Sequence, residues 1–99
     1  MKMIKKLVDC IEEELEGAQN YAEKYVEYKA NGNTKWSGRF KSMAEDELQH
    51  SNYIHELAVE EISKLRSVYE PSQDMVDKWD KAHTKYVEKA AWIKQMLSL

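Results

Sequence analysis

The chain has 99 residues, enough for one domain and too few for a second independent core. Apolar residues make up 42% and charged residues 33%, and no apolar run approaches the roughly 20 residues that cross a bilayer, which excludes disordered and membrane-spanning chains. The net charge of −3 with mixed signs leaves no basic footprint for nucleic acid. The apolar stretch after the basic first residues is too short for the expected core of a signal peptide, and the single cysteine, Cys10, suits a reducing compartment. We therefore expect a cytoplasmic protein in which Cys10 is a partly buried apolar residue.

Helix-breaking residues occur at only two places, so the sequence predicts three long helices. In the first break, the Asn-Gly-Asn-Thr at 31–34, a glycine or asparagine can take the left-handed conformation that ends a helix, and an asparagine or threonine can cap the next one. In the second break, Pro71 ends a helix and Ser72 starts another, with Asp74 in its first turn. We expect one all-α domain, residues 1–99, with helices over about 3–30, 35–69 and 73–97.

Each predicted helix carries an apolar seam with alternating steps of three and four residues, which is typical of left-handed bundle packing. The seams are Ile4, Leu7, Ile11, Glu14, Ala18, Tyr21, Tyr25 and Tyr28 in the first helix; Trp36, Phe40, Met43, Glu47, His50, Ile54, Leu57, Ala58, Ile62 and Leu65 in the second; and Val76, Trp79, His83, Tyr86, Ala90, Ile93 and Leu97 in the third. The polar residues in these seams are Glu14, Glu47, His50 and His83. They are the candidate functional residues, because a carboxylate in a helical core costs free energy unless it is paired or binds a metal.

Three of these polar residues are expected to converge. Glu14 lies about 18 residues before the first turn, and Glu47 and His50 lie about 14 to 18 residues after it, so antiparallel helices bring all three to one level. Glu47 and His50 also form a Glu-x-x-His step, which places both side chains on one helix face, able to bind the same ion. Carboxylates with one imidazole suit iron, manganese or zinc. The sequence therefore predicts a metal site formed by Glu14, Glu47 and His50.

The two other histidines lie outside this constellation. On a third helix that returns from a loop near residue 71, the level of His50 falls near residue 91, so His83 lies about ten residues short, roughly 15 Å along the axis. We expect His83 to be a core or interface residue hydrogen-bonded to a neighbour, although Asp80 and His83 form an Asp-x-x-His step that could bind a second metal. His55 is off the seam and is expected in solvent.

These motifs resemble the ferritin-like superfamily, most closely its rubrerythrin branch and the short encapsulated ferritins. In rubrerythrin-like proteins the first helix supplies a Glu followed seven residues later by a Tyr, here Glu14 and Tyr21. The second helix supplies Glu-x-x-His, here Glu47 and His50, and the interval of 33 positions from Glu14 to Glu47 is also similar to that family's. The match covers the first two predicted helices. The nearby Glu13 and Glu16 lie off the seam and are expected at the surface or along an entry path.

The resemblance implies a di-iron carboxylate protein whose four-helix bundle is completed by dimerisation, because only one further long helix remains here. Two copies related by a two-fold axis would supply two Glu14, two Glu47 and two His50, so we expect a homodimer or larger even-numbered assembly with two irons at the interface. Manganese or zinc are alternatives. The implied activity is that of a ferroxidase or peroxide-handling oxidoreductase, with Tyr21 as the catalytic neighbour that donates a hydrogen bond or an electron. The last residues, 92–99, are expected to be the end of the third helix and not a targeting peptide for a shell protein.

Two other readings of the same residues stay open. In the first, the protein is a metal-free helical assembly or adaptor, with Glu14 turned to the bundle edge and Glu47 paired with His50 or Tyr21. In the second, one chain alone forms a mononuclear or zinc site. The chain has no CxxC pair and hence no rubredoxin-type electron supply, which favours ferroxidase chemistry over a full peroxidase cycle.

Overall fold

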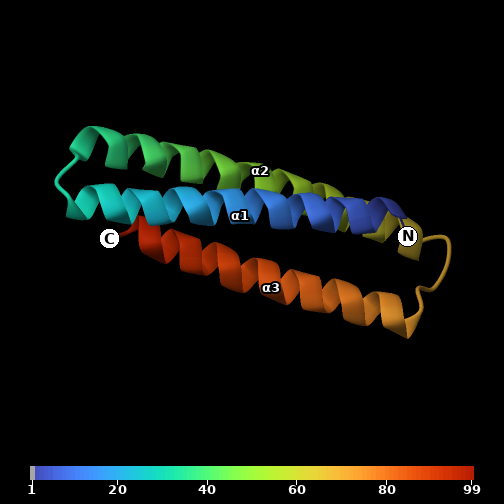
Figure 1. Ribbon diagram of the computed structural model, residues 1–99. Helices are drawn as coiled ribbons and strands as arrows, with labels where there is room; N and C mark the ends of the chain where they lie inside the picture. Colours follow the sequence, from blue (N-terminus) through green and yellow to red (C-terminus); the bar gives the residue numbers. More distant parts are fainter. Residues whose placement is uncertain (1) are drawn as a thin grey trace.

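The computed structural model describes residues 2–99, which form three helices and no strand (Figure 1). Helix α1 spans Lys2–Ala30, α2 spans Thr34–Arg66 and α3 spans Gln73–Leu97. The prediction of an all-helical domain with three long helices is confirmed. Over the described residues, no helix has a stretch apolar enough to cross a membrane.

The turn between α1 and α2 uses the residues that the sequence suggested. Gly32 has φ +76°, and its N–H donates to Lys29 O while the Asn33 N–H donates to Tyr28 O, the two bonds of a Schellman motif. The Asn33 side chain then accepts from Trp36 N at 3.2 Å and caps α2. The turn is therefore tight, and α1 and α2 run antiparallel side by side (Figure 1).

Helix α2 ends at Arg66, three residues before the predicted 69. The Ser67 N–H donates to the carbonyl oxygens of both Ser63 and Lys64, and the Val68 N–H donates to Leu65 O. The bonds to Lys64 and Leu65 span three residues instead of four, so the last turn is tighter than an α-helix and the helix ends before Pro71. Ser72 then caps α3 by accepting from Met75 N at 3.3 Å, with Asp74 in the first turn, as predicted.

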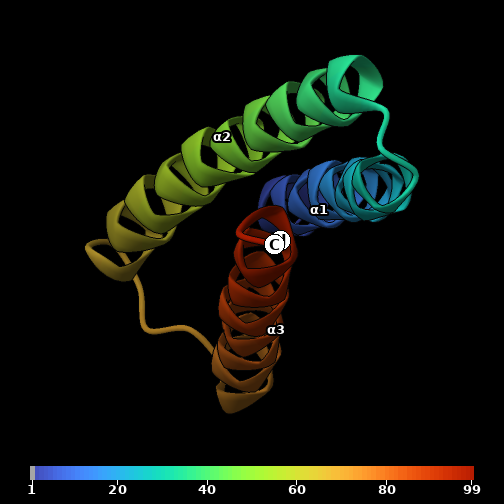
Figure 2. The ribbon, with the colours of Figure 1, turned by 90° about the vertical axis from the view of Figure 1, so that its left-hand side faces the viewer.

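Helix α1 lies at the corner of the molecule, and α2 and α3 diverge from it (Figure 2). The core forms where α1 meets both neighbours, and Ile93 of α3 is fully buried there. The buried apolar residues of this core are Ile11, Leu15, Ala18, Ala22, Tyr25, Ala44, Leu48, Ala90, Ile93 and Leu97. Between α2 and α3 the contacts come from long side chains, such as Tyr86, which donates a hydrogen bond to Asn52. Cys10 is exposed, contrary to the expectation of partial burial.

The buried face of α2 is shifted by one residue from the predicted seam. Its buried residues are Ser37, Ala44, Leu48, Ser51 and Ala58. Four of the five are serine or alanine, and such small side chains let the α1 and α2 backbones approach closely. The larger seam residues are displaced to the flank, where Trp36 is 45% exposed, Met43 38% and Leu57 44%.

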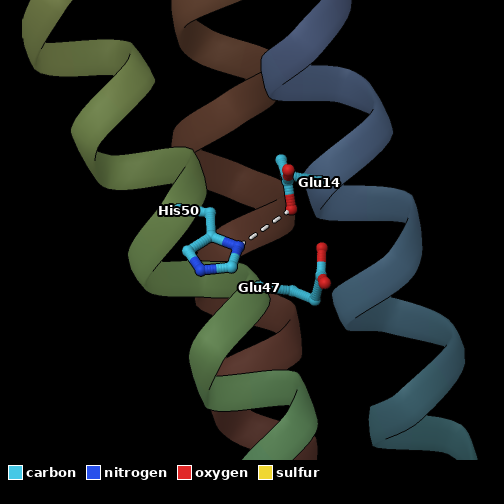
Figure 3. Close-up of side chains that lie close together, drawn as sticks. All are labelled: Glu14, Glu47 and His50. Atoms are coloured by element: carbon cyan, nitrogen blue, oxygen red, sulfur yellow. Dashed lines mark ion pairs between the residues drawn. The ribbon is translucent and has the colours of Figure 1, made fainter.

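The α1–α2 pair consequently has one face covered by α3 and one open face. We define the open face by the displaced seam residues, which are Glu14, Tyr21 and Tyr28 of α1 and Trp36, Phe40, Met43, Glu47, His50, Ile54 and Leu57 of α2. All are exposed or half-buried. At its end near the turn, Phe40 packs against Tyr21, Tyr28 and Trp36, with ring centroids 5.4 to 6.3 Å apart. Figure 3 shows α3 behind the two helices at the middle of this face.

Candidate metal centre

Glu14, Glu47 and His50 meet at the middle of the open face (Figure 3). One ligand atom from each residue lies within 4.8 Å of the other two. Glu14 comes from α1, whereas Glu47 and His50 lie one turn apart on α2, so the antiparallel pairing brings them to one level. The predicted convergence of the three side chains is confirmed, and their role as metal ligands stays a prediction.

The Glu14 carboxylate has one oxygen without a hydrogen-bonding partner. Its Oε2 atom is buried and makes no hydrogen bond within residues 2–99, and Nδ1 of His50 lies 3.5 Å from it. The side chains of His50 and Glu14 are 55% and 28% exposed. A buried acceptor left without a donor is uncommon and costs free energy, and a bound cation would satisfy it.

The neighbouring Glu14 carboxyl group makes Glu47 easier to protonate. A hydrogen bond with Glu14 raises the pKa of Glu47, and burial and the negative charge of Glu14 raise it further, while His50 acts in the opposite direction. In the absence of a cation, Glu47 therefore holds a proton more readily than a free glutamate does. A divalent cation could replace that proton, because it would neutralise both groups at once.

Gly17 gives the Glu47 side chain its place against α1. A Cβ atom at this position would lie 3.3 Å from Oε2 of Glu47, which is tighter than ordinary van der Waals contact. A glycine in the middle of a helix costs about 0.5–1 kcal/mol relative to alanine. The absence of a side chain at Gly17 allows the Glu47 carboxylate to lie close to the backbone of α1.

Tyr21, the predicted catalytic neighbour, lies two turns from Glu14 along α1, about 10 Å along the axis. It is half-buried, and its ring packs on Phe40 at 6.2 Å between centroids. It lies on the open face with the cluster, but is too far along the helix to extend the ligand set of Glu14 directly. Glu13 and Glu16, expected at the surface, are both exposed.

The register of α3 differs from the prediction. Asn52 forms a hydrogen bond with Tyr86, and His55 forms one with His83. In antiparallel helices, residues at one level have numbers with a constant sum, and both of these pairs add to 138. His50 is therefore level with residue 88 instead of 91. The offset arises because α2 ends earlier than predicted and the turn centre moves from residue 71 to 69. No side chain of α3, within the described residues, joins the cluster.

The expectation for His83 is confirmed in part, and that for His55 is wrong. His83 has a hydrogen-bonding neighbour, as expected, but it is exposed and its partner is His55, with Nε2 of His55 2.9 Å from Nδ1 of His83. His55, expected in solvent, is half-buried and stacks on Tyr86 with 4.4 Å between centroids. Asp80 is exposed and lines a different groove from the one that His83 lines, and the Asp-x-x-His step stays an untested prediction.

The sequence analysis did not predict the role of Gly17 or the pairing of His55 with His83. Both could have been found from the distances of these residues to the two turns. Gly17 and Glu47 are each 15 residues from Gly32, and His55 and His83 are each 14 residues from the turn centre at 69. Pairing residues symmetrically about each turn would have placed both pairs side by side.

Comparisons with protein-family models, with characterised proteins and with solved structures found no match to this chain.

Proposed function

We propose that this chain is half of a ferritin-like di-iron protein, and that two copies pair through the open face to form a site that oxidises Fe²⁺. The observation that carries the proposal is the convergence of Glu14, Glu47 and His50, with one buried carboxylate oxygen that makes no hydrogen bond. The motif spacing of the first two helices, which resembles that of rubrerythrin-like proteins, supports the same reading.

A second copy is the partner that the site requires. One chain offers two carboxylates and one imidazole, which is half of the four-carboxylate, two-imidazole set of the ferritin-like family. The open face also exposes Trp36, Met43 and Leu57 at intervals of seven residues, with His50 in the same row. Such a row suits the seam of a helical bundle. A two-fold axis through the middle of this face would bring the two clusters together and cover the exposed apolar side chains.

The roles of the residues follow from their chemistry. Glu14 and Glu47 would bind the metal through oxygen and His50 through nitrogen, a donor set of intermediate softness that suits Fe²⁺, Mn²⁺ or Zn²⁺. Iron, when bound, would supply the electrons that reduce O₂ or peroxide. Glu47 would release its proton on metal binding, and the apolar residues of the open face would exclude bulk water once paired. Tyr21 would lie beside this interface as the donor of a hydrogen bond or an electron.

The test is iron stoichiometry measured together with oligomeric state on protein reconstituted anaerobically with Fe²⁺. We expect about one iron per chain in a dimer or higher even-numbered assembly, and Fe²⁺-dependent oxygen consumption that Glu47→Gln abolishes. Glu13→Gln, a change to an exposed glutamate one residue before Glu14, is the matched control and should leave both unchanged.

The metal-free assembly and the single-chain zinc site make different predictions in the same experiment. An oligomer that binds no metal would leave the three residues as a polar network in a structural bundle, a reading that the raised pKa of Glu47 also allows. A monomer that binds one Zn²⁺ per chain would identify a site within one subunit. Either result would overturn the proposal.

A further inference from the structure

A second group of metal-binding side chains lies between α2 and α3, apart from the proposed iron site. His55 of α2 and His83 of α3 meet with Nε2 and Nδ1 2.9 Å apart. They border a pocket of about 160 Å³ that is also lined by Glu12 and Glu16 of α1. Neither histidine has a role in the proposed function.

We propose that His55 and His83 bind one late first-row divalent ion, Cu²⁺, Ni²⁺ or Zn²⁺, in a two-imidazole site that links α2 to α3. Metal–nitrogen bonds of about 2.0–2.1 Å in a tetrahedral site separate two nitrogens by about 3.3 Å. The rings therefore need to part by only about 0.4 Å from their present hydrogen bond. His83 is exposed and can make this movement without disturbing the core.

The protonation of the pair suits metal binding. In the metal-free pair, one ring donates its N–H to the facing nitrogen of the other ring. When an ion binds, the donating ring changes tautomer, and its hydrogen moves to its other nitrogen, which faces away. Both facing nitrogens then present lone pairs to the ion, and a neutral pair loses no proton. Burial, helped by the neighbouring His83, lowers the pKa of His55 and keeps its ring neutral near pH 7. A neutral imidazole is the form that binds metals.

The surroundings fix one ring and indicate the class of ion. His55 is stacked on Tyr86 at 4.4 Å with planes 10° apart and on Trp79 at 5.9 Å, so its Nε2 atom is held facing Nδ1 of His83. The charged side chains lining the pocket are two carboxylates, Glu12 and Glu16, and two ammonium groups, Lys85 and Lys89, which balance. Two imidazoles without an oxygen-rich shell favour Cu²⁺, Ni²⁺ or Zn²⁺ over Mg²⁺ or Ca²⁺.

The experiment uses the full chain carrying Glu14→Gln, Glu47→Gln and His50→Gln, so that none of the three proposed iron ligands can contribute. We expect one Cu²⁺ per chain, with hyperfine splitting from two nitrogens in the electron paramagnetic resonance spectrum, and a rise in melting temperature with Zn²⁺. Adding His83→Gln should remove all three signals. Asp80→Asn, an exposed change one turn before His83, is the control and should remove none.

The proposal is overturned if Cu²⁺ and Zn²⁺ bind equally well with and without His83→Gln, or if neither ion binds stoichiometrically. The pair would then be a hydrogen bond between two helices and no more. Iron binding by protein carrying His83→Gln alone separates the two sites, because the proposed iron site does not use His83 and should be unaffected.

Discussion

A single glycine in the middle of α1 decides how closely Glu47 can approach that helix. Gly17 sits one turn from Glu14, and the carboxylate of Glu47 lies where a Cβ atom would be in tight contact. The sequence predicted the three candidate ligands because each is polar at an apolar position. It did not reveal Gly17, because the role of this glycine depends on the position of the Glu47 side chain on the neighbouring helix. The periodicity of α1 alone contains no information about that contact.

Replacing this glycine separates its two effects. Gly17→Ala should improve helix propensity by up to about 1 kcal/mol, but it should also push the Glu47 carboxylate away and weaken Fe²⁺ binding. Gly38→Ala is the matched control, since a Cβ at this exposed position of α2 meets nothing within 4 Å. It should stabilise the protein without changing metal affinity. Titration calorimetry and thermal unfolding measure both quantities, and equal metal affinity in the two variants would contradict this role of Gly17.

The raised pKa of Glu47 predicts how the stability of the metal-free protein depends on pH. The pKa of Glu47 is raised above its ordinary value of 4.5, so the folded state holds a proton that the unfolded chain has lost. The contribution of Glu47 is fully present below pH 4.5 and is lost as the pH rises through the raised pKa. Glu47→Gln should therefore gain stability relative to the natural protein as the pH rises toward 7. Urea unfolding across this pH range is the measurement. A constant difference between the two proteins would contradict the raised pKa of Glu47.

At the scale of the elements, helix α2 has two different packing faces, one buried and one open. Its serine and alanine face packs on α1, and its larger apolar residues lie one position away on the open face. The three- and four-residue periodicity correctly predicted that α2 is an amphipathic helix in a bundle. It could not decide which of two adjacent rows faces α1, because side-chain size and the distance between backbones make that choice. The same periodicity predicted the α1–α2 turn well, because capping chemistry is local.

The exposed row on α2 predicts a specific effect on assembly. Leu57→Lys should weaken the proposed dimer at least tenfold, about 1.4 kcal/mol, because a two-fold interface would lose the burial of two leucines. Val87→Lys, at a 50% exposed position of α3 away from the open face, should leave the dimer intact. Sedimentation equilibrium over a concentration series distinguishes the two. Dissociation by both variants, or a monomeric natural protein, would count against pairing through the open face.

At the scale of the whole molecule, α3 is attached chiefly through its C-terminal half. Ala90, Ile93 and Leu97 are buried against α1, whereas the N-terminal half of α3 diverges and touches α2 only through side chains such as His83 (Figure 2). The sequence predicted this buried row correctly. The register was displaced by about three residues because the end of α2 depends on a non-repeating turn that periodicity does not describe.

The attachment of α3 should therefore depend on very few residues. Ile93→Ala should lower the free energy of unfolding by about 2–4 kcal/mol, because it leaves a cavity at a fully buried position. Trp92→Ala, at the 55% exposed neighbouring position, should change it by less than about 0.5 kcal/mol. Chemical denaturation of both variants is the measurement, and similar losses for the two would show that α3 packs differently.

The open face is made only from residues between Glu14 and Leu57, all of them in the first two helices. A growing chain on the ribosome would have completed this surface before α3 was synthesised, because both of its helices precede α3 in the sequence. Neighbouring ribosomes on one messenger RNA would then present matching surfaces while both chains were unfinished. If two copies pair as proposed, their association could begin during translation, with α3 docking afterwards on the other side.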